Sequence, residues 1–117
     1  MPSIQRHDAG ARMSNIVVHN GTAYLAGAVA NDYGGDITQQ TIETLADIEK
    51  SLAAIGSDKS RLLRAQIWLR DIGRDFDAMN AVWEKWLPPG AAPARATCEA
   101  RMADPGILIE IIVTAAV

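Results

Sequence analysis

The stretch "APARATCEARMADPGILIEIIVTAAV", residues 92–117, decides the fold, because it holds the most apolar run of the chain with a charge inside it. Successive side chains of a strand point to opposite faces. One face of the predicted strand carries Ile107, Ile109, Ile111 and Val113, and the opposite face carries Glu110. A buried carboxylate needs a partner, water or a chemical role. Glu110 is therefore the first candidate functional residue.

The remaining strands are recognised by alternation and by their turns. The stretch predicts strands at 94–101 and 107–115, joined by a turn at 104–106 that contains Pro and Gly. Upstream, "RLLRAQIWLRD" at 61–71 alternates between apolar and polar side chains and predicts another strand. Residues 15–19 and 22–26 flank Asn20-Gly21, which is typical of a tight hairpin, and 4–7 suits a short edge strand.

Two helices are predicted between these strands. Asp36 and Gln39 have the spacing of a capping box, and Gly56 is suited to end the first helix. The second helix is predicted at 75–86, before the "PPG" at 88–90. Their apolar stripes are Ile42, Leu45, Ile48, Leu52 and Ile55 in the first, and Phe76, Met79, Trp83 and Trp86 in the second.

The predicted order β-β-β-α-β-α-β-β indicates an α+β fold with a single six-stranded mixed sheet, in which helical crossovers join strands and the last two strands form a closing hairpin. Right-handed crossovers place both helices on one face of that sheet and leave the other face uncovered. We expect that face to carry Arg64, Gln66, Trp68, Arg95, Thr97, Leu108, Glu110 and Ile112. This set is too apolar to remain exposed to solvent and too polar to form a hydrophobic core. It predicts self-association, with a functional site completed by another subunit.

Composition limits the possible functions. The 117 residues suit one domain spanning 1–117, with 49% hydrophobic and 21% charged residues. The net charge of −3 argues against a nucleic-acid partner, and neither a signal segment nor a membrane span is recognised, so we expect a cytoplasmic protein. One cysteine, Cys98, and two histidines, His7 and His19, make an intrachain disulfide impossible and a metal site improbable.

Several motifs resemble the Rid family (RidA, also called YjgF). Besides residues 92–117, they are "VVHNGTAYLAGAVA" at 17–30, "GSDKSRLLRAQIWLRDI" at 56–72 and "FDAMNAVWEKWLPPGAAPAR" at 76–95. The resemblance runs from about residue 16 to 117 and indicates a divergent subgroup. It implies the chorismate-mutase-like fold, assembled as a homotrimer with clefts between subunits. It also implies an enamine/imine deaminase, which hydrolyses reactive 2-imino (2-enamino) carboxylates to 2-keto acids and ammonia without a cofactor.

The resemblance also assigns roles to residues. Arg95, in the Pro-x-Arg motif, would hold the substrate carboxylate, and Glu110 would position the attacking water. Gly27 would lie beside the ligand cleft. Thr97 stands where the family often has cysteine, and we expect it to contribute its backbone. Met13 replaces a tyrosine that lines the cleft.

Other departures and alternatives remain open at this point. Ala26 replaces a serine near the cleft, which with the change at Met13 leaves the preferred substrate side chain undetermined. Without the resemblance, Arg95 suits a salt bridge to Glu99 or Asp104 of a neighbour, and Glu110 suits a structural hydrogen bond. The alternative function is a non-catalytic trimeric module that binds a keto acid. RNA cleavage, linked to some family members, fits the acidic charge poorly.

Overall fold

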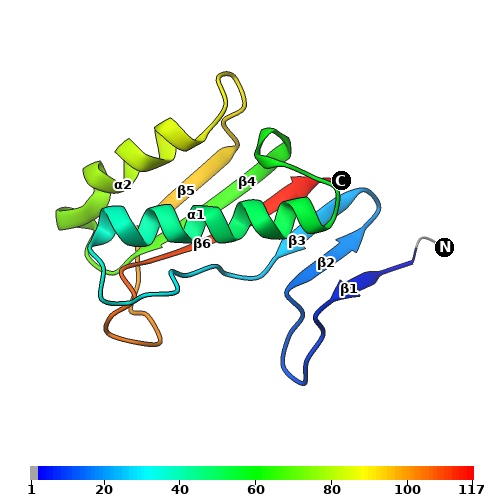
Figure 1. The fold of residues 1–117 in the computed structure, drawn as a ribbon, viewed down its shortest axis with the longest axis horizontal. Helices are drawn as coiled ribbons and strands as arrows, with labels where there is room; N and C mark the ends of the chain where they lie inside the picture. Colours follow the sequence, from blue (N-terminus) through cyan, green and yellow to red (C-terminus); the bar gives the residue numbers. More distant parts are fainter. Residues whose placement is uncertain (1–2) are drawn as a thin grey trace.

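Six strands form one mixed sheet in the spatial order β1-β2-β3-β6-β4-β5, in a computed structural model that describes residues 3–117 (Figure 1). The strands are β1 (Gln5–His7), β2 (Ile16–His19), β3 (Thr22–Leu25), β4 (Leu62–Leu69), β5 (Ala94–Glu99) and β6 (Ile109–Ala116). β4 and β5 run parallel, and the other neighbouring pairs are antiparallel. The predicted six-stranded mixed sheet is confirmed.

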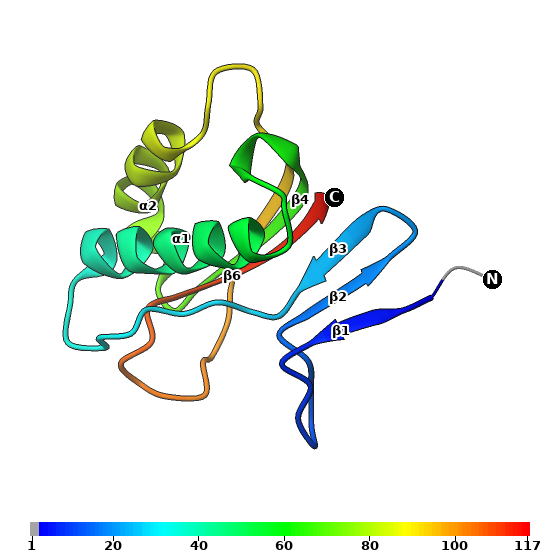
Figure 2. The ribbon, with the colours of Figure 1, turned by 45° about the vertical axis from the view of Figure 1, so that its right-hand side comes forward.

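Two helices, α1 (Ile37–Ala54) and α2 (Ile72–Trp86), cover one face of this sheet, as predicted. α1 packs against β6, α2 packs against β4, and the two helices contact each other (Figure 2). A short 3-10 turn, η1 (Lys59–Arg61), leads into β4. The core between the helices and the sheet is made of fully buried side chains, among them Leu45, Ile48, Leu52, Ile67 and Ile111.

The ends of both helices follow from local hydrogen bonds. The Asp36 carboxylate accepts the Gln39 N–H at 2.9 Å, but the Gln39 side chain donates to Glu43, so only half of the capping box forms. Gly56, just after α1, has a φ of +76°, which favours glycine. α2 begins at Ile72, earlier than the predicted residue 75, because the Asp71 carboxylate accepts the Arg74 N–H and starts the helix.

Parts of both predicted apolar stripes are not buried. Ile42 on α1 remains 49% exposed, and Phe76 on α2 remains 37% exposed, whereas Met79 and Trp83 are buried as expected. Each exposed residue lies at the margin of its stripe, beyond the width that the sheet covers. Both are therefore available to a neighbouring group or ligand.

The sheet face away from the helices, called the open face, is defined by register. On β4, exposed or half-buried side chains alternate with buried Ala65, Ile67 and Leu69. Trp68 pairs with Glu110, which places Glu110 on the open face as the alternation predicts. The open face carries Tyr24, Arg64, Gln66, Trp68, Glu110, Ile112 and Thr114.

Three residues that the sequence assigned to the open face lie elsewhere. Arg95 pairs with Ala65 and Thr97 pairs with Ile67, so both point toward the helix layer. β5 is an edge strand, and a long arginine stem on that face reaches the margin of the helices without crossing the core. Leu108 precedes β6 and packs against the core beside the helix starts. The prediction was wrong for these three.

The last two strands do not form the predicted hairpin, because β4 lies between them, and their bounds also differ from the predicted ones. β5 ends at Glu99 rather than at residue 101, and β6 begins at Ile109 rather than at residue 107. Both ladders stop opposite Leu69, where β4 itself ends and α2 follows. Within residues 3–117, the helices are too short or too polar to cross a membrane.

Candidate functional site

Arg95 is held between β5 and α2. Its Nη1 donates a hydrogen bond of 2.7 Å to Oδ1 of Asn80. Its guanidinium carbon lies 6.0 Å from the ring centre of Phe76 and 5.8 Å from that of Trp83. Aromatic faces attract a guanidinium at these distances, and the amide fixes its rotation. One edge of the group is thus occupied by the protein.

The rest of the Arg95 guanidinium is free to bind an anion. Within residues 3–117, its nitrogens have no carboxylate oxygen within 4.0 Å. Burial lowers the pKa of Arg95 from its ordinary value, and the charge of nearby Glu84 opposes that change. The group remains protonated at neutral pH. A half-buried guanidinium with unused, fixed donors is suited to grip a planar carboxylate through parallel hydrogen bonds.

Thr97 lies two residues beyond Arg95 on the same face. Its Oγ1 is buried, and it is the single buried side-chain polar atom within residues 3–117 that has no hydrogen-bond partner. The Ala100 N–H donates to the Leu69 carbonyl, so even-numbered residues of β5 direct their backbone groups to β4. By alternation, the N–H groups of Arg95 and Thr97 point to the free edge of the sheet. The backbone role expected for Thr97 is geometrically available and stays a prediction.

Glu110 and Gly27 form a second group, on the open face. A Cβ at position 27 would overlap Oε2 of Glu110, so only glycine leaves room for this carboxylate. Tyr24 pairs with Thr114 but Ala28 pairs with Ile111, so the segment containing Gly27 holds one extra residue. Such bulges are frequent beside active sites. Burial raises the pKa of Glu110 from its ordinary value, which favours proton transfer closer to neutral pH.

Met13 stands apart from both groups in the single chain. It lies in the loop between β1 and β2, is 60% exposed, and accepts a hydrogen bond from the Gly10 N–H through its carbonyl. The Ala26 N–H donates to the Asn15 carbonyl, which ties this loop to the end of β3 near Gly27. Met13 is therefore on the Gly27 side of the molecule and faces solvent.

The candidate residues therefore form two groups that one chain keeps apart. The Arg95 group lies on the helix side of edge strand β5, and the Glu110 group lies on the open face beside β3. Side chains on opposite faces of one sheet cannot converge on a single ligand. A site that uses Arg95 and Glu110 together needs two copies of the chain.

The sequence interpretation missed the residues that hold Arg95. Asn80, Phe76 and Trp83 come from one side of α2, at spacings of four and three residues. α2 connects β4 to β5, which lies next to β4 and runs parallel to it. The helix must therefore cross over these two strands, which brings it near Arg95. The spacing of these three residues on α2, combined with the crossover, could therefore have predicted their contact with Arg95.

The chain is similar to known proteins over nearly its whole length. The family model described as Endoribonuclease L-PSP matches residues 3–117. The RutC family protein YoaB of Escherichia coli strain K12 is 44% identical over 115 residues, covering 98% of this chain and 99% of that relative. A RutC family protein of Haemophilus ducreyi is 43% identical over 114 residues, covering 97% of each.

Solved structures agree with these relatives. The crystal structure of a member of the YjgF protein family from Neisseria meningitidis gives a TM-score of 0.93 at 42% identity, covering 97% of this chain and 94% of that one. The shared architecture is the chorismate-mutase-like fold implied by the sequence motifs. The chain belongs to the Rid family, also called the YjgF or RutC family, whose model is described as Endoribonuclease L-PSP.

Proposed function

We propose that the protein is an enamine/imine deaminase that hydrolyses 2-imino carboxylates to 2-keto acids and ammonia, at a site shared by neighbouring subunits of a homotrimer. The observation that carries the proposal is the state of Arg95, which is half-buried, fixed by Asn80 and without a carboxylate partner in residues 3–117. The two carboxylates that a structural role would favour are engaged elsewhere. Glu99 accepts the Ile72 N–H, and Asp104 accepts the Gly106 N–H.

The chemistry requires an anchor and a positioned water. Arg95 binds the substrate carboxylate and fixes the adjacent C=N carbon. Water held by Glu110 attacks that carbon, Glu110 accepts the proton that the water loses, and the imine nitrogen takes up a proton from solvent. Glu110 then returns its proton to the nitrogen of the carbinolamine. The C–N bond breaks as the hydroxyl group gives its proton back to Glu110, and a 2-keto acid and ammonia leave. A 2-enamino carboxylate enters the same path after protonation at C3.

The assembly is part of the proposal, because the anchor and the water-binding group lie on opposite faces of one sheet. The open face combines Trp68, Ile112 and Tyr24, the last 52% exposed, with the Glu110 carboxylate. Packing the open face against another subunit removes its apolar area from water. Such contact also brings the Glu110 of one subunit near the β5 edge of the next.

The remaining candidate residues are assigned to the two sides of this cleft. The Thr97 N–H lies at the β5 edge with Arg95 and is suited to donate to the substrate carboxylate. Gly27 leaves space for the Glu110 carboxylate and for a ligand above it. Met13 lies at the mouth on the Gly27 side, where an apolar side chain replaces the family's tyrosine and contacts the substrate's side chain.

The test is ammonia release from 2-iminopropanoate, generated from alanine by an amino-acid oxidase. Arg95→Ala should lower the accelerated rate about 10- to 100-fold, which corresponds to losing hydrogen bonds to a charged group. Arg95→Lys should recover little, because it cannot form two parallel bonds. Arg6→Ala, on exposed β1, is the matched control and should keep wild-type activity.

The result also separates the alternative function. If wild-type protein gives no acceleration but is stabilised thermally by 2-oxobutanoate, and Arg95→Ala abolishes that stabilisation, the protein is a carboxylate-binding module. If neither turnover nor binding depends on Arg95, the proposed site is wrong.

A further inference from the structure

A groove runs between the outer surfaces of α1 and α2, away from the open face. Its volume is about 740 Å³. Its lining includes Thr38, Ile42, Ala46 and Glu49 of α1, and Ala81, Lys85 and Trp86 of α2. Both helices lie on the side of the sheet opposite the open face (Figure 2). Contact between subunits through the open face therefore leaves the groove accessible.

The walls of the groove are mainly apolar. Ile42 remains 49% exposed there because the sheet takes up the rest of the α1 stripe. Ala46 and Ala81 are small, so the two helices leave a hollow between them rather than closing it. An apolar hollow of this size with few polar groups is typical of a site for a small molecule.

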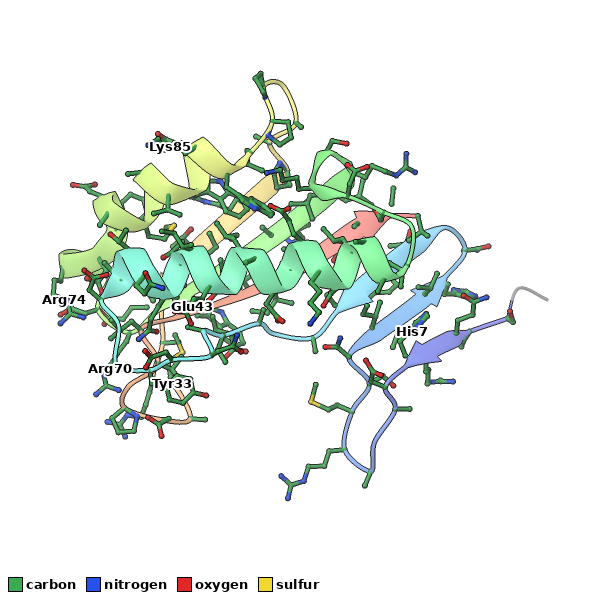
Figure 3. All side chains as sticks on the ribbon, in the orientation of Figure 1. His7, Tyr33, Glu43, Arg70, Arg74 and Lys85 are labelled. Atoms are coloured by element: carbon green, nitrogen blue, oxygen red, sulfur yellow. The ribbon has the colours of Figure 1, made fainter. Side chains whose placement is uncertain are left out.

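The charges at the groove are not balanced. Oε1 of Glu49 accepts a hydrogen bond from Nε1 of Trp86 and forms an ion pair of 3.2 Å with Lys59, so the charge of Glu49 is balanced by Lys59. Lys85 projects at the outer surface of α2 (Figure 3). Across residues 3–117, no carboxylate oxygen lies within 4.0 Å of its Nζ. The groove therefore presents an apolar wall with one unpaired cation.

We propose that this groove binds a small amphipathic monoanion, with an apolar chain along the helices and a carboxylate at Lys85. The lining residues of α1 run from Thr38 to Glu49, which spans about 16 Å at 1.5 Å per residue. That length suits an extended aliphatic carboxylate. The site is separate from Arg95 and Glu110, so it does not depend on the proposed deaminase activity.

The experiment is a calorimetric titration of the intact protein with decanoate, below its micelle concentration. Decan-1-ol is the neutral comparison and should bind more weakly. Lys85→Glu should weaken decanoate binding roughly three- to tenfold, the range for one exposed charge contact and its reversal. Lys50→Glu makes the same charge change on α1 outside the groove and should bind as wild type does.

A second variant tests the groove itself. Ala81→Glu places a carboxylate in the hollow at an exposed helical position and should abolish decanoate binding while the folded, assembled state is retained. Ala46→Glu does the same from α1 and is used if the first variant fails to fold. Undetectable decanoate binding by the wild type overturns the proposal. So does binding that is equal for decan-1-ol, or equally strong after Lys85→Glu and after Lys50→Glu.

Discussion

A site shared between subunits predicts that two inactive variants restore each other when mixed. Arg95→Ala removes the proposed anchor on the β5 edge, and Glu110→Gln removes the proposed proton acceptor on the open face. Each homotrimer carries one kind of defect in all of its sites and should be nearly inactive. Each proposed site takes Arg95 from one subunit and Glu110 from the next subunit around the ring. In a mixed trimer, a Glu110→Gln subunit, which keeps Arg95, is followed by an Arg95→Ala subunit, which keeps Glu110, at one interface. That interface holds one intact site.

The magnitude follows from this geometry. A purified trimer with two subunits of one kind and one of the other should have about one third of the wild-type activity, since one interface in three is intact. After unfolding and refolding of an equal mixture, the average should be about one quarter, the chance that an intact anchor faces an intact acceptor. Mixing folded homotrimers without exchange should restore nothing.

The assay is ammonia release from 2-iminopropanoate, with the two variants carrying different affinity tags so that mixed assemblies can be isolated. The mixture must be compared with each variant refolded alone. Activity in the mixture no greater than the average of the two variants, in assemblies shown to contain both, would refute the shared site. Gly27→Val should also inactivate the site from the open face, because the valine side chain would displace Glu110. Mixed assemblies of Gly27→Val and Arg95→Ala subunits should regain activity in the same way.

Three further outcomes are expected from single residues. Burial raises the pKa of Glu110, so ionisation destabilises the fold as the pH rises above the ordinary carboxyl range; Glu110→Gln should therefore raise the melting temperature at pH 8 but not at pH 3.5. Gln40 is fully buried; its Nε2 donates to three backbone carbonyls and its Oε1 accepts one backbone N–H. Because Gln40→Met leaves these backbone groups without partners, it should lower the free energy of unfolding, measured in urea, by about 1–3 kcal/mol. Gly27→Ala should move the Glu110 carboxylate and lower kcat more than it weakens 2-oxobutanoate binding.

Each of these has a control and a contradicting result. An equal gain in melting temperature at both pH values would show that the Glu110 effect is not ionisation. Gln39→Met alters an exposed neighbour and should change stability by less than about 0.5 kcal/mol; a loss as large as that of Gln40→Met would contradict the buried network. Gly10→Ala is the control: its new methyl group has only a backbone oxygen near it, at 3.6 Å, so the variant should keep full activity. An unchanged kcat in Gly27→Ala would contradict a role for Glu110 in the reaction.

The strands and the helix layer were predictable because each element carries its own signal, but the order of the strands in the sheet was not, since β5 and β6 lie on either side of β4 instead of forming a hairpin. Asp36 and Gly56 mark the two ends of α1, and the Asn20-Gly21 turn fixes the register of β2 and β3. Apolar alternation separates the faces of β6, and those of β4 from Ala65 onward. Leu63, which strict alternation puts on the same face as Ala65, is instead 50% exposed, because the pairing with β6 shifts between Leu62 and Arg64. These are local features, and local chemistry is what a sequence reports directly.

The face of β5 was not predictable in the same way. Alternation shows that Arg95 and Thr97 share a side, but not which side the helices cover. Charge suggested the open face, whereas the parallel register with β4 places Arg95 beside buried Ala65. At an edge strand, the long stem of arginine carries its charge to the helix margin, so a charged residue is tolerated on the covered face. The contacts of Arg95 with α2 depend on this tertiary arrangement.

The position of β6 has a consequence for synthesis on the ribosome. β6 is the last strand along the chain, yet it lies in the middle of the sheet, between β3 and β4. The hairpin of β2 and β3 can pair as it emerges, but β3 and β4 each expose an unpaired edge until residues 109–116 have been released. Unpaired edges are templates for wrong pairing, so the nascent chain is open to aggregation until β6 has been synthesised and has paired with β3 and β4. We expect chaperone contact to persist until then, and to end when the sheet closes.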